Sequence, residues 1–257
     1  MTATPLTILT GASRGMGLAM ARQLLGAGHQ LLCIARSTSP ELDLLANEKG
    51  AQLTQWSQDL AQTGPAAERL RAWLAAQDTA SLASATLINN AGVIPRIGPL
   101  EDCPPEQLTN ALRVDLEAPM QLTAAFLHAT NAWVAAGWTG ARKVLNISSG
   151  LGRHAMAAQA PYCAAKAGMD HFTRCSALDE AQKPHGARLV SLAPGVIDTD
   201  MQVQLRAGDA TAFPDLQRFV ELKRQGQLSS PEAAAERVLA WLARPDFGEK
   251  PVADVRD

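Results

Sequence analysis

Short apolar runs alternate along the chain with longer segments in which apolar and polar positions are mixed. A run of four to eight apolar residues, bounded by polar or glycine positions, is typical of a buried strand. The pattern predicts strands at Leu6–Thr10, Gln30–Ala35, Gln52–Gln55, Ala85–Asn89, Arg142–Ser148, Arg188–Ala193 and, at an edge, Val252–Val255. With helices between them, this rhythm predicts an α/β fold: one doubly wound domain over residues 1–257, with a central parallel sheet of about seven strands and helices on both faces.

The segment Thr199–Gln227 interrupts this rhythm. It is long, contains Gly208 and Pro214, and follows the sixth strand at its carboxyl end, where open α/β sheets bind ligands. We therefore expect a small helical lid over a substrate. Ser230-Pro231-Glu232 then predicts the start of a last helix, with serine as N-cap and proline in the first turn, running to about Arg244.

Composition and charge exclude several classes of protein. The 257 residues, 47% of them hydrophobic, suffice for one buried α/β core, and the formal charge of −2 offers no basic field for nucleic acid or an anionic membrane. The chain has four scattered cysteines, no signal-peptide pattern at its start and no apolar stretch long enough to span a membrane. We expect a soluble cytoplasmic protein. The five histidines show no metal-ligand spacing, so no metal site is predicted.

The first predicted strand runs into the glycine-rich turn TGASRGMG. Glycines at 11, 15 and 17 would let the backbone approach a pyrophosphate, and the following helix would direct its first N–H groups at it. The alternative is a tight strand–helix connection that binds nothing. The predicted phosphate-binding residues are Gly11, Ala12, Ser13, Arg14, Gly15, Met16 and Gly17.

The end of the second predicted strand bears on which dinucleotide binds. NAD-binding domains usually carry an acidic residue there, whereas this chain has Ala35-Arg36-Ser37. Arg14 and Arg36 could together hold a 2′-phosphate, so the sequence predicts NADP(H). Alternatively, Arg36 is a solvated loop residue. Asp59 and Leu60, after the third strand, are expected to meet the adenine.

Tyr162 and Lys166 are four residues apart in a predicted helix, which places the phenol and the ammonium on one face. A nearby cation stabilises phenolate, so we expect Lys166 to lower the pKa of Tyr162 from its usual value near 10. Such pairs are common on helix surfaces, and their meaning depends on the surrounding motifs.

With INNAG (88–92), ISSG (147–150), YCAAK (162–166) and LAPGVIDT (192–199) in this order, the sequence resembles the short-chain dehydrogenase/reductase family over almost its whole length. The resemblance implies a Rossmann-type domain in which Ser149 orients the substrate carbonyl and Tyr162 donates the proton. Lys166 would hold the nicotinamide ribose, and NADPH would supply the hydride. The resemblance places further residues at the cofactor, namely Asn90, Ala91, Gly92, Pro194, Ile197, Asp198, Thr199, Asp200, Met201 and Gln202, and adds Ser148 and Gly195 at the substrate.

The last third of the chain is similar to sepiapterin reductases and bacterial benzil reductases of that family, in APGVIDTDMQ (193–202), FPDLQRFVELKRQGQL (213–228) and VADVRD (252–257). By this resemblance Asp254 would anchor a pterin ring. The alternative is a surface aspartate.

The expected activity is reduction of a small ketone or vicinal dicarbonyl, sepiapterin-like or benzil-like. The alternatives are a 3-oxoacyl-thioester or sugar-alcohol reductase and, less favoured, a non-catalytic NADP(H)-binding sensor. The resemblance also implies a homodimer or homotetramer.

One position departs from the family pattern. In VDLEAPM, Asp115 stands where the family usually has an asparagine that holds a relay water for the lysine. If Asp115 occupies that place, its carboxylate favours protonated Lys166 and partly cancels the positive field of the lysine at Tyr162, so the pKa of Tyr162 rises. We then expect a site biased towards reduction. The alternative is a carboxylate that is turned away and solvated.

Overall fold

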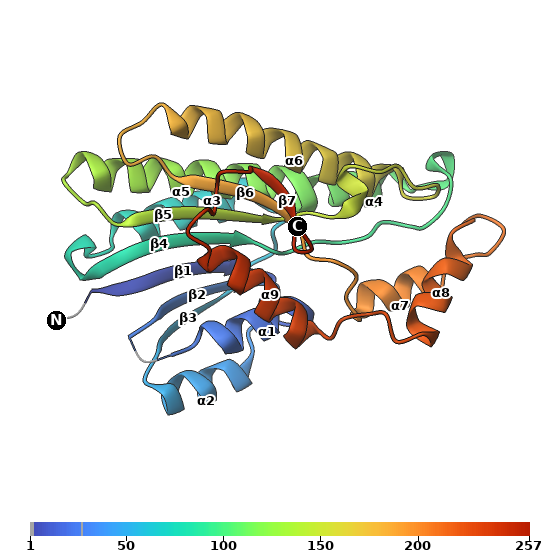
Figure 1. Ribbon diagram of the computed structural model, residues 1–257, viewed down its shortest axis with the longest axis horizontal. Coiled ribbons are helices and arrows are strands. Elements are labelled where there is room, and N and C mark those ends of the chain that lie inside the picture. The colour runs from blue at the N-terminus through green and yellow to red at the C-terminus, as the bar shows by residue number, and fades with distance from the viewer. Residues whose placement is uncertain (1–2, 27) are drawn as a thin grey trace.

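The protein, seen here as a computed structural model that describes residues 3–26 and 28–257, forms a seven-stranded parallel sheet in the order β3-β2-β1-β4-β5-β6-β7 (Figure 1). The strands are β1 (Thr4–Thr10), β2 (Gln30–Ala35), β3 (Gln52–Ser57), β4 (Leu82–Asn89), β5 (Ala141–Ile147), β6 (Arg188–Ala193) and β7 (Val252–Asp254). All seven predicted strands are present, with ends that differ by up to three residues. The predicted fold class is confirmed.

Helices cover both faces of the sheet. They are α1 (Gly15–Leu24), α2 (Pro40–Lys49), α3 (Thr63–Ala75), α4 (Pro105–Leu112), α5 (Ala118–Ala135), α6 (Ala160–Ala181), α7 (Asp200–Arg206), α8 (Leu216–Arg224) and α9 (Pro231–Ala243). The Ser230 hydroxyl accepts from the Ala233 N–H at 3.1 Å, so the last helix begins at the predicted cap. Within residues 3–26 and 28–257, no helix combines the length and apolar character of a membrane span.

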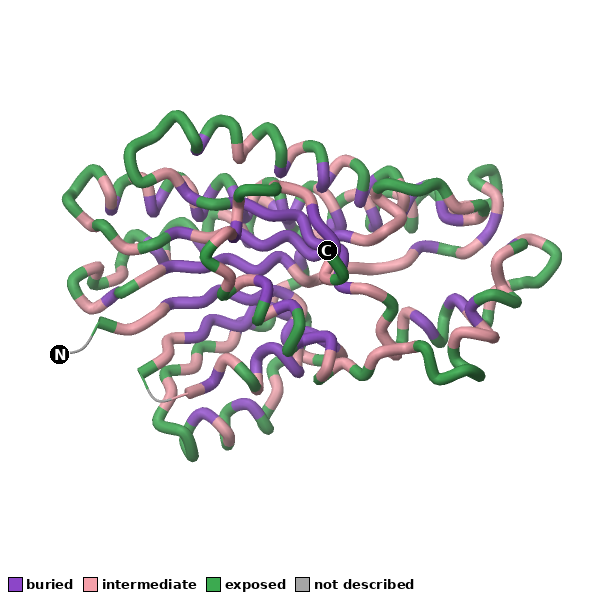
Figure 2. The backbone as a smooth tube through the Cα atoms, viewed as in Figure 1, coloured by how far each residue is buried: buried purple, intermediate pink, exposed green. Residues whose placement is uncertain are grey.

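The sheet has a hydrophobic core on each side, because successive side chains of a strand point to opposite faces. In β2, Leu31 and Cys33 pack with α1, α2 and α9, whereas Leu32 and Ile34 pack with α3 and α5. Figure 2 shows the buried strands through the middle of the molecule. Burial on both faces explains why these strands appear in the sequence as continuous apolar runs.

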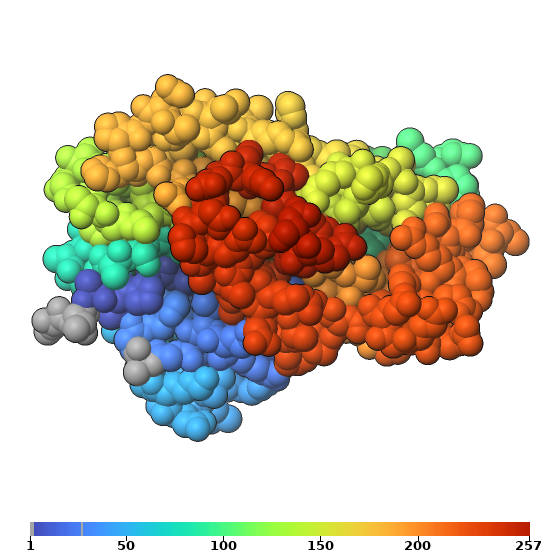
Figure 3. All heavy atoms as spheres, viewed as in Figure 1, coloured from blue at the N-terminus to red at the C-terminus, as the bar shows by residue number. Residues whose placement is uncertain are grey.

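The segment predicted as a lid contains α7 and α8 and lies beyond the carboxyl end of β6 (Figure 1). Leu205, Phe213 and Phe219 form a third, small apolar cluster there, and the rings of Phe213 and Phe219 stack at 5.6 Å. This cluster is separate from the two cores of the sheet. In the space-filling view the lid, in orange, projects at one end of the molecule (Figure 3).

A buried ion pair joins β5 to the carboxyl-terminal part of α6. Arg142 Nη2 lies 3.4 Å from Glu180 Oε2, and both side chains are almost fully buried. The guanidinium also donates to the His185 carbonyl at 2.7 Å and to Asn131 Oδ1 at 2.6 Å, and Glu180 accepts from the Ala187 N–H at 2.9 Å. The hydrogen bonds compensate both charges, as buried ions require.

We expect Glu180→Ala to lower the free energy of unfolding by about 3–5 kcal/mol, because it leaves the Arg142 charge buried without its counter-ion. Guanidinium denaturation of both proteins measures the loss. Asp179→Ala, which removes the exposed neighbouring carboxylate, should change stability by no more than about 0.5 kcal/mol. Equal stability losses in the two variants would contradict this role for the pair.

Candidate active site

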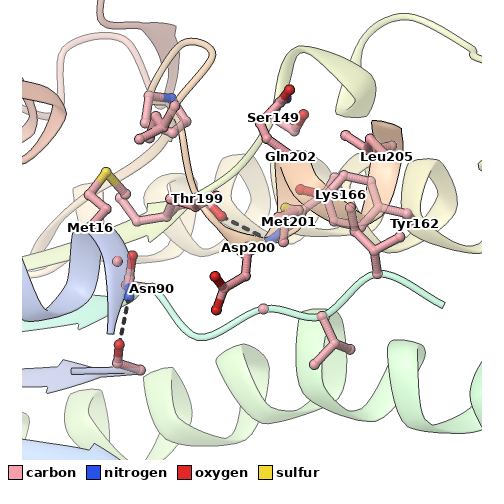
Figure 4. Close-up of a pocket in the computed structure, with 18 of the residues that line it drawn as sticks. Met16, Asn90, Ser149, Tyr162, Lys166, Thr199, Asp200, Met201, Gln202 and Leu205 are labelled. Carbon is pink, nitrogen blue, oxygen red and sulfur yellow. Dashed lines mark hydrogen bonds between the residues drawn. The ribbon is translucent and has the colours of Figure 1, made fainter. Parts of the chain in front are cut away.

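A cavity of about 1040 Å³ opens at the carboxyl ends of the strands. It runs from the glycine turn between β1 and α1, past the ends of β4 and β5, to the start of α6 and the underside of the lid. Figure 4 shows Met16 and Asn90 on one side of it and Ser149, Tyr162 and Lys166 on the other. Motifs far apart in the sequence therefore share one space, because the strands are parallel and end at the same edge.

The glycine turn packs tightly against α1 and the loop after β4, which leaves no room for side chains at Gly11 and Gly17. Gly11 has a φ of 70°, and a Cβ on Gly17 would lie 2.1 Å from the Gly11 carbonyl oxygen. Arg14, the N-cap of α1, makes no side-chain cap, so the first N–H groups of α1 are left for a ligand. The turn fits the pyrophosphate of a dinucleotide, for which these donors and the positive end of the helix dipole are suited.

The two arginines expected at a 2′-phosphate both line the cavity. Arg36 is exposed. Arg14 Nη1 lies 3.0 Å from Asp200 Oδ2, and this exposed pair connects the glycine turn to the first residue of α7. Asp59 Oδ1 accepts from the Ala61 N–H at 3.0 Å, which orders the loop after β3 beside the same cavity. Asp198, also at the cavity, pairs with Lys223 of the lid.

Most of the predicted cofactor and substrate residues line this cavity, with two exceptions. Ala12 is buried in the core beneath the glycine turn. Asp115 lies behind the cavity wall, against Gly92 and Lys166. The predicted residues that do line it are Gly11, Ser13, Arg14, Gly15, Met16, Gly17, Ala35, Arg36, Asp59, Leu60, Asn90, Ala91, Gly92, Ser148, Ser149, Tyr162, Lys166, Pro194, Gly195, Ile197, Asp198, Thr199, Asp200, Met201, Gln202 and Asp254.

Ser149, Tyr162 and Lys166 meet at the end of the cavity nearest the lid. Ser149 follows β5, and its hydroxyl oxygen accepts from the Leu151 N–H at 3.1 Å, which leaves its proton for the Tyr162 oxygen or a ligand. Tyr162 and Lys166 lie one turn apart on α6, with Lys166 Nζ 5.6 Å from the centre of the tyrosine ring. The same Nζ donates to the Ile147 carbonyl at 3.0 Å. This arrangement can polarise a carbonyl and deliver a proton to it.

Comparison with known proteins agrees with this geometry. A sequence model described as short chain dehydrogenase matches residues 6–210. The chain belongs to the short-chain dehydrogenase family. The benzil reductase ((S)-benzoin forming) of Bacillus cereus is 35% identical over 93% of this chain and 94% of its own length. The sepiapterin reductase of Meriones unguiculatus is 32% identical over 93% and 92%. The crystal structure of the KRED1-Pglu enzyme superimposes with a TM-score of 0.78 at 26% identity, covering 96% of this chain and 99% of that one.

As a short-chain dehydrogenase, the protein is an oxidoreductase whose family uses nicotinamide dinucleotides, and the ionisation of its tyrosine is central. Burial raises the pKa of Tyr162, the charge of Asp115 raises it further, and the Ser149 hydroxyl opposes the rise. The pKa of Tyr162 therefore lies above its usual value, as expected from the carboxylate of Asp115, and not below it, as expected from Lys166. The pKa of Lys166 is itself lowered by burial, against the effect of Asp115 and Asp170, so at the lysine desolvation outweighs the neighbouring charges, whereas at the tyrosine burial and the charge of Asp115 act together.

Asp115 of this short-chain dehydrogenase lies in a π-helical turn, Arg113–Glu117, between α4 and α5. Its Oδ1 accepts from the Val93 N–H at 3.0 Å and lies 4.0 Å from Lys166 Nζ, and its Oδ2 is buried without a partner among the described residues. Burial raises the pKa of Asp115 to about 6, while Lys166 and the Val93 N–H oppose the rise. The carboxylate therefore faces the lysine and is not solvated.

Asp170 is a site residue that our sequence reasoning missed. Its Oδ1 accepts from the Ser148 and Ser191 hydroxyls at 2.6 Å, and its Oδ2 accepts from Arg153 Nε at 3.1 Å. These bonds join α6 to the ends of β5 and β6 and to the loop after Ser149. Because the Ser148 hydroxyl donates to Asp170, it is committed to this network. The spacing could have found Asp170, since it continues the four-residue interval from Tyr162 through Lys166.

Asp254 lies at the margin of the cavity, at the end of β7. Both of its oxygens accept from Arg256, Nε and Nη2, at 2.6 Å, and this contact lowers the pKa of Asp254. The carboxylate expected to anchor a pterin ring is therefore already engaged by the guanidinium two residues further on. No three His, Cys, Asp or Glu side chains within residues 3–26 and 28–257 gather as a group that could hold a metal ion.

We expect Asp115→Asn to move the alkaline limb of the pH profile for carbonyl reduction to lower pH. Without the carboxylate, phenolate is less disfavoured, the pKa of Tyr162 falls, and the protonated donor is lost earlier as the pH rises. The profiles of the wild type and the variant should differ for this reason only above about pH 6, where Asp115 carries its charge. Profiles of kcat/KM against pH measure this shift. Glu106→Gln, an equal charge change in exposed α4, should leave the profile in place. Superimposable profiles for Asp115→Asn and the wild type would contradict the electrostatic role.

Proposed function

We propose that the protein is an NADPH-dependent carbonyl reductase that acts on small ketones and vicinal dicarbonyls. The observation that carries the proposal is the meeting of Ser149, Tyr162 and Lys166 in the cavity that also contains the glycine turn. The benzil reductase and sepiapterin reductase relatives, each matched over most of its length, support this choice of substrate class.

The character of the cavity near the lid supports a substrate with an apolar body. Its lining there includes Ile94, Met156, Leu205, Phe219 and Leu222, which come from the loop after β4, the loop before α6, and α7 and α8. Burial of apolar surface contributes about 25 cal/mol per Å², so a phenyl or alkyl substituent would be stabilised beneath the lid. The alternative substrates, 3-oxoacyl thioesters and sugar alcohols, differ in charge and polarity, and a substrate screen separates them from diketones.

Each residue has a distinct part in the proposed reaction. Ser149 donates a hydrogen bond to the substrate carbonyl oxygen and polarises it, while the Leu151 N–H fixes the direction of its hydroxyl. Tyr162 transfers its proton to the same oxygen as the alcohol forms. Lys166 would hold the nicotinamide ribose, and the dinucleotide, when bound, supplies the hydride. Because the pKa of Tyr162 is raised, the phenol keeps the proton that reduction needs further into alkaline pH than an ordinary tyrosine would.

The preference for NADPH rests on charge. Arg14 and Arg36 line the cavity close to the glycine turn, and Ala35 ends β2 where NAD-binding domains usually carry an acid. Guanidinium groups bind phosphate with two parallel hydrogen bonds.

The expected homodimer or homotetramer and the cytoplasmic location remain predictions. Leu178, exposed on α6, offers an apolar contact for self-association.

We expect Tyr162→Phe to reduce kcat for benzil or a similar diketone by about a hundred-fold or more, because the ring remains but the proton donor is lost. NADPH oxidation followed by absorbance measures the rate. Titration of the variant with NADPH should give an affinity close to that of the wild type. Wild-type turnover in this variant would rule out Tyr162 as the donor.

We expect Arg36→Asp to weaken NADPH binding by about ten-fold or more, because a charge-assisted contact is replaced by repulsion. Binding of NADH, which lacks the 2′-phosphate, should not weaken. Calorimetric titration with both dinucleotides measures the two affinities. Arg71→Asp, the same charge change on exposed α3, should alter neither affinity. If the wild type binds NADPH and NADH equally, the proposed cofactor preference is wrong.

A further inference from the structure

Gln159 is a buried polar residue of the cavity that the proposed reaction does not use. It is the N-cap residue of α6, three positions before Tyr162, and it is only 1% exposed. It lines the cavity together with Ser149 and Tyr162. Gln159 and the proposed proton donor therefore occupy neighbouring positions of the cavity wall, three residues apart at the start of α6.

The orientation of the Gln159 amide is determined by its neighbour. Its Nε2 donates to the Ala158 carbonyl at 3.0 Å. A carbonyl can only accept, so the amide nitrogen must face it and Oε1 must be the other end. This Oε1 is shielded from solvent and has no hydrogen-bond partner among the described residues. A buried acceptor without a donor destabilises a protein and is rare in native structures.

The backbone that holds this amide is itself unusual. Ala158 has a φ of 63°, a left-handed conformation that residues with a Cβ rarely adopt. Its carbonyl also accepts from the Gly98 N–H at 3.2 Å, and its side chain packs against the apolar cluster of the lid. Contacts on two sides therefore maintain a strained conformation beside the proposed proton donor, and such strain concentrates at functional sites.

We infer that Gln159 determines substrate specificity: its Oε1 accepts a hydrogen bond from a hydroxyl or N–H group next to the carbonyl that is reduced. This inference rests on the proposed function and narrows its substrate class. The preferred substrates are ketones that carry a donor on the adjacent carbon, above all α-hydroxyketones. The second oxygen of a vicinal dicarbonyl is an acceptor and leaves Oε1 unpaired, so dicarbonyls rank below hydroxyketones of similar shape.

The test compares 2-hydroxyacetophenone with 2-methoxyacetophenone, which have the same ring and carbonyl but differ in the donor. We expect the wild type to reduce the hydroxyketone with NADPH about five- to a hundred-fold more efficiently, in kcat/KM, because the methyl ether leaves a buried acceptor unpaired. The Gln159→Met side chain is similar in length but has no amide. In this variant the ratio of the two kcat/KM values should fall towards one, because kcat/KM for the hydroxyketone falls. Gln182→Met, the same exchange at the exposed end of α6, should keep the wild-type ratio.

Calorimetric titration of both ketones into the wild-type protein saturated with NADP⁺ gives a second readout that does not depend on turnover. Tighter binding of the hydroxyketone, abolished in Gln159→Met, supports the inference even if neither ketone is reduced, an outcome that would overturn the proposed reductase activity alone. Equal kcat/KM and equal binding of the two ketones by the wild type would overturn the inference without any variant. A wild-type ratio retained in folded Gln159→Met would overturn it as well.

Discussion

Lys166 is 3% exposed, and the charge of its ammonium has to be stabilised by protein groups because almost no water reaches it. Three elements contribute to this stabilisation. The Ile147 carbonyl at the end of β5 accepts its hydrogen bond, the π-helical turn brings Asp115 to 4.0 Å, and Asp170 acts from the next turn of α6. Gly92 belongs to the same arrangement, because a Cβ there would lie 2.9 Å from Asp115 Oδ1. One buried cation thus links groups from β5, the π-helical turn and α6, next to the loop after β4.

The carboxylate of Asp115, which stabilises the Lys166 charge, also affects the neighbouring Tyr162. A carboxylate that favours the lysine cation also disfavours phenolate, and burial acts in the same direction on Tyr162. Asp115 therefore supports the charge of one group and the proton of the other. An asparagine in its place could hold a water but would supply neither effect. The one carboxylate thus favours a charged lysine beside a neutral tyrosine, in a volume where burial disfavours both the ammonium and the phenolate.

The fold and the outline of the cavity were predictable from the sequence because both depend on local patterns. Apolar runs locate the strands, and parallel strands bring the motifs after β1, β4, β5 and β6 to one edge. The tertiary partners of individual side chains were not predictable. The pairing of Arg14 with Asp200 spans 186 positions, and the Asp170 network depends on how α6 packs on two strands. The upward effect of Asp115 on the pKa of Tyr162 was predicted from the sequence, but the larger effect of burial was not, because desolvation depends on the whole surrounding structure.

The lid is stabilised differently from the rest of the molecule. Its cluster of Leu205, Phe213 and Phe219 is separate from the cores on either side of the sheet, and its connection to the glycine turn is the exposed pair of Arg14 and Asp200. A segment with its own small core can unfold locally at a lower free energy than the sheet. Amide hydrogens of α7 and α8 then exchange by sub-global opening while those of β1 and β4 exchange only on global unfolding, so the entrance and the framework of the cavity fluctuate on separate timescales.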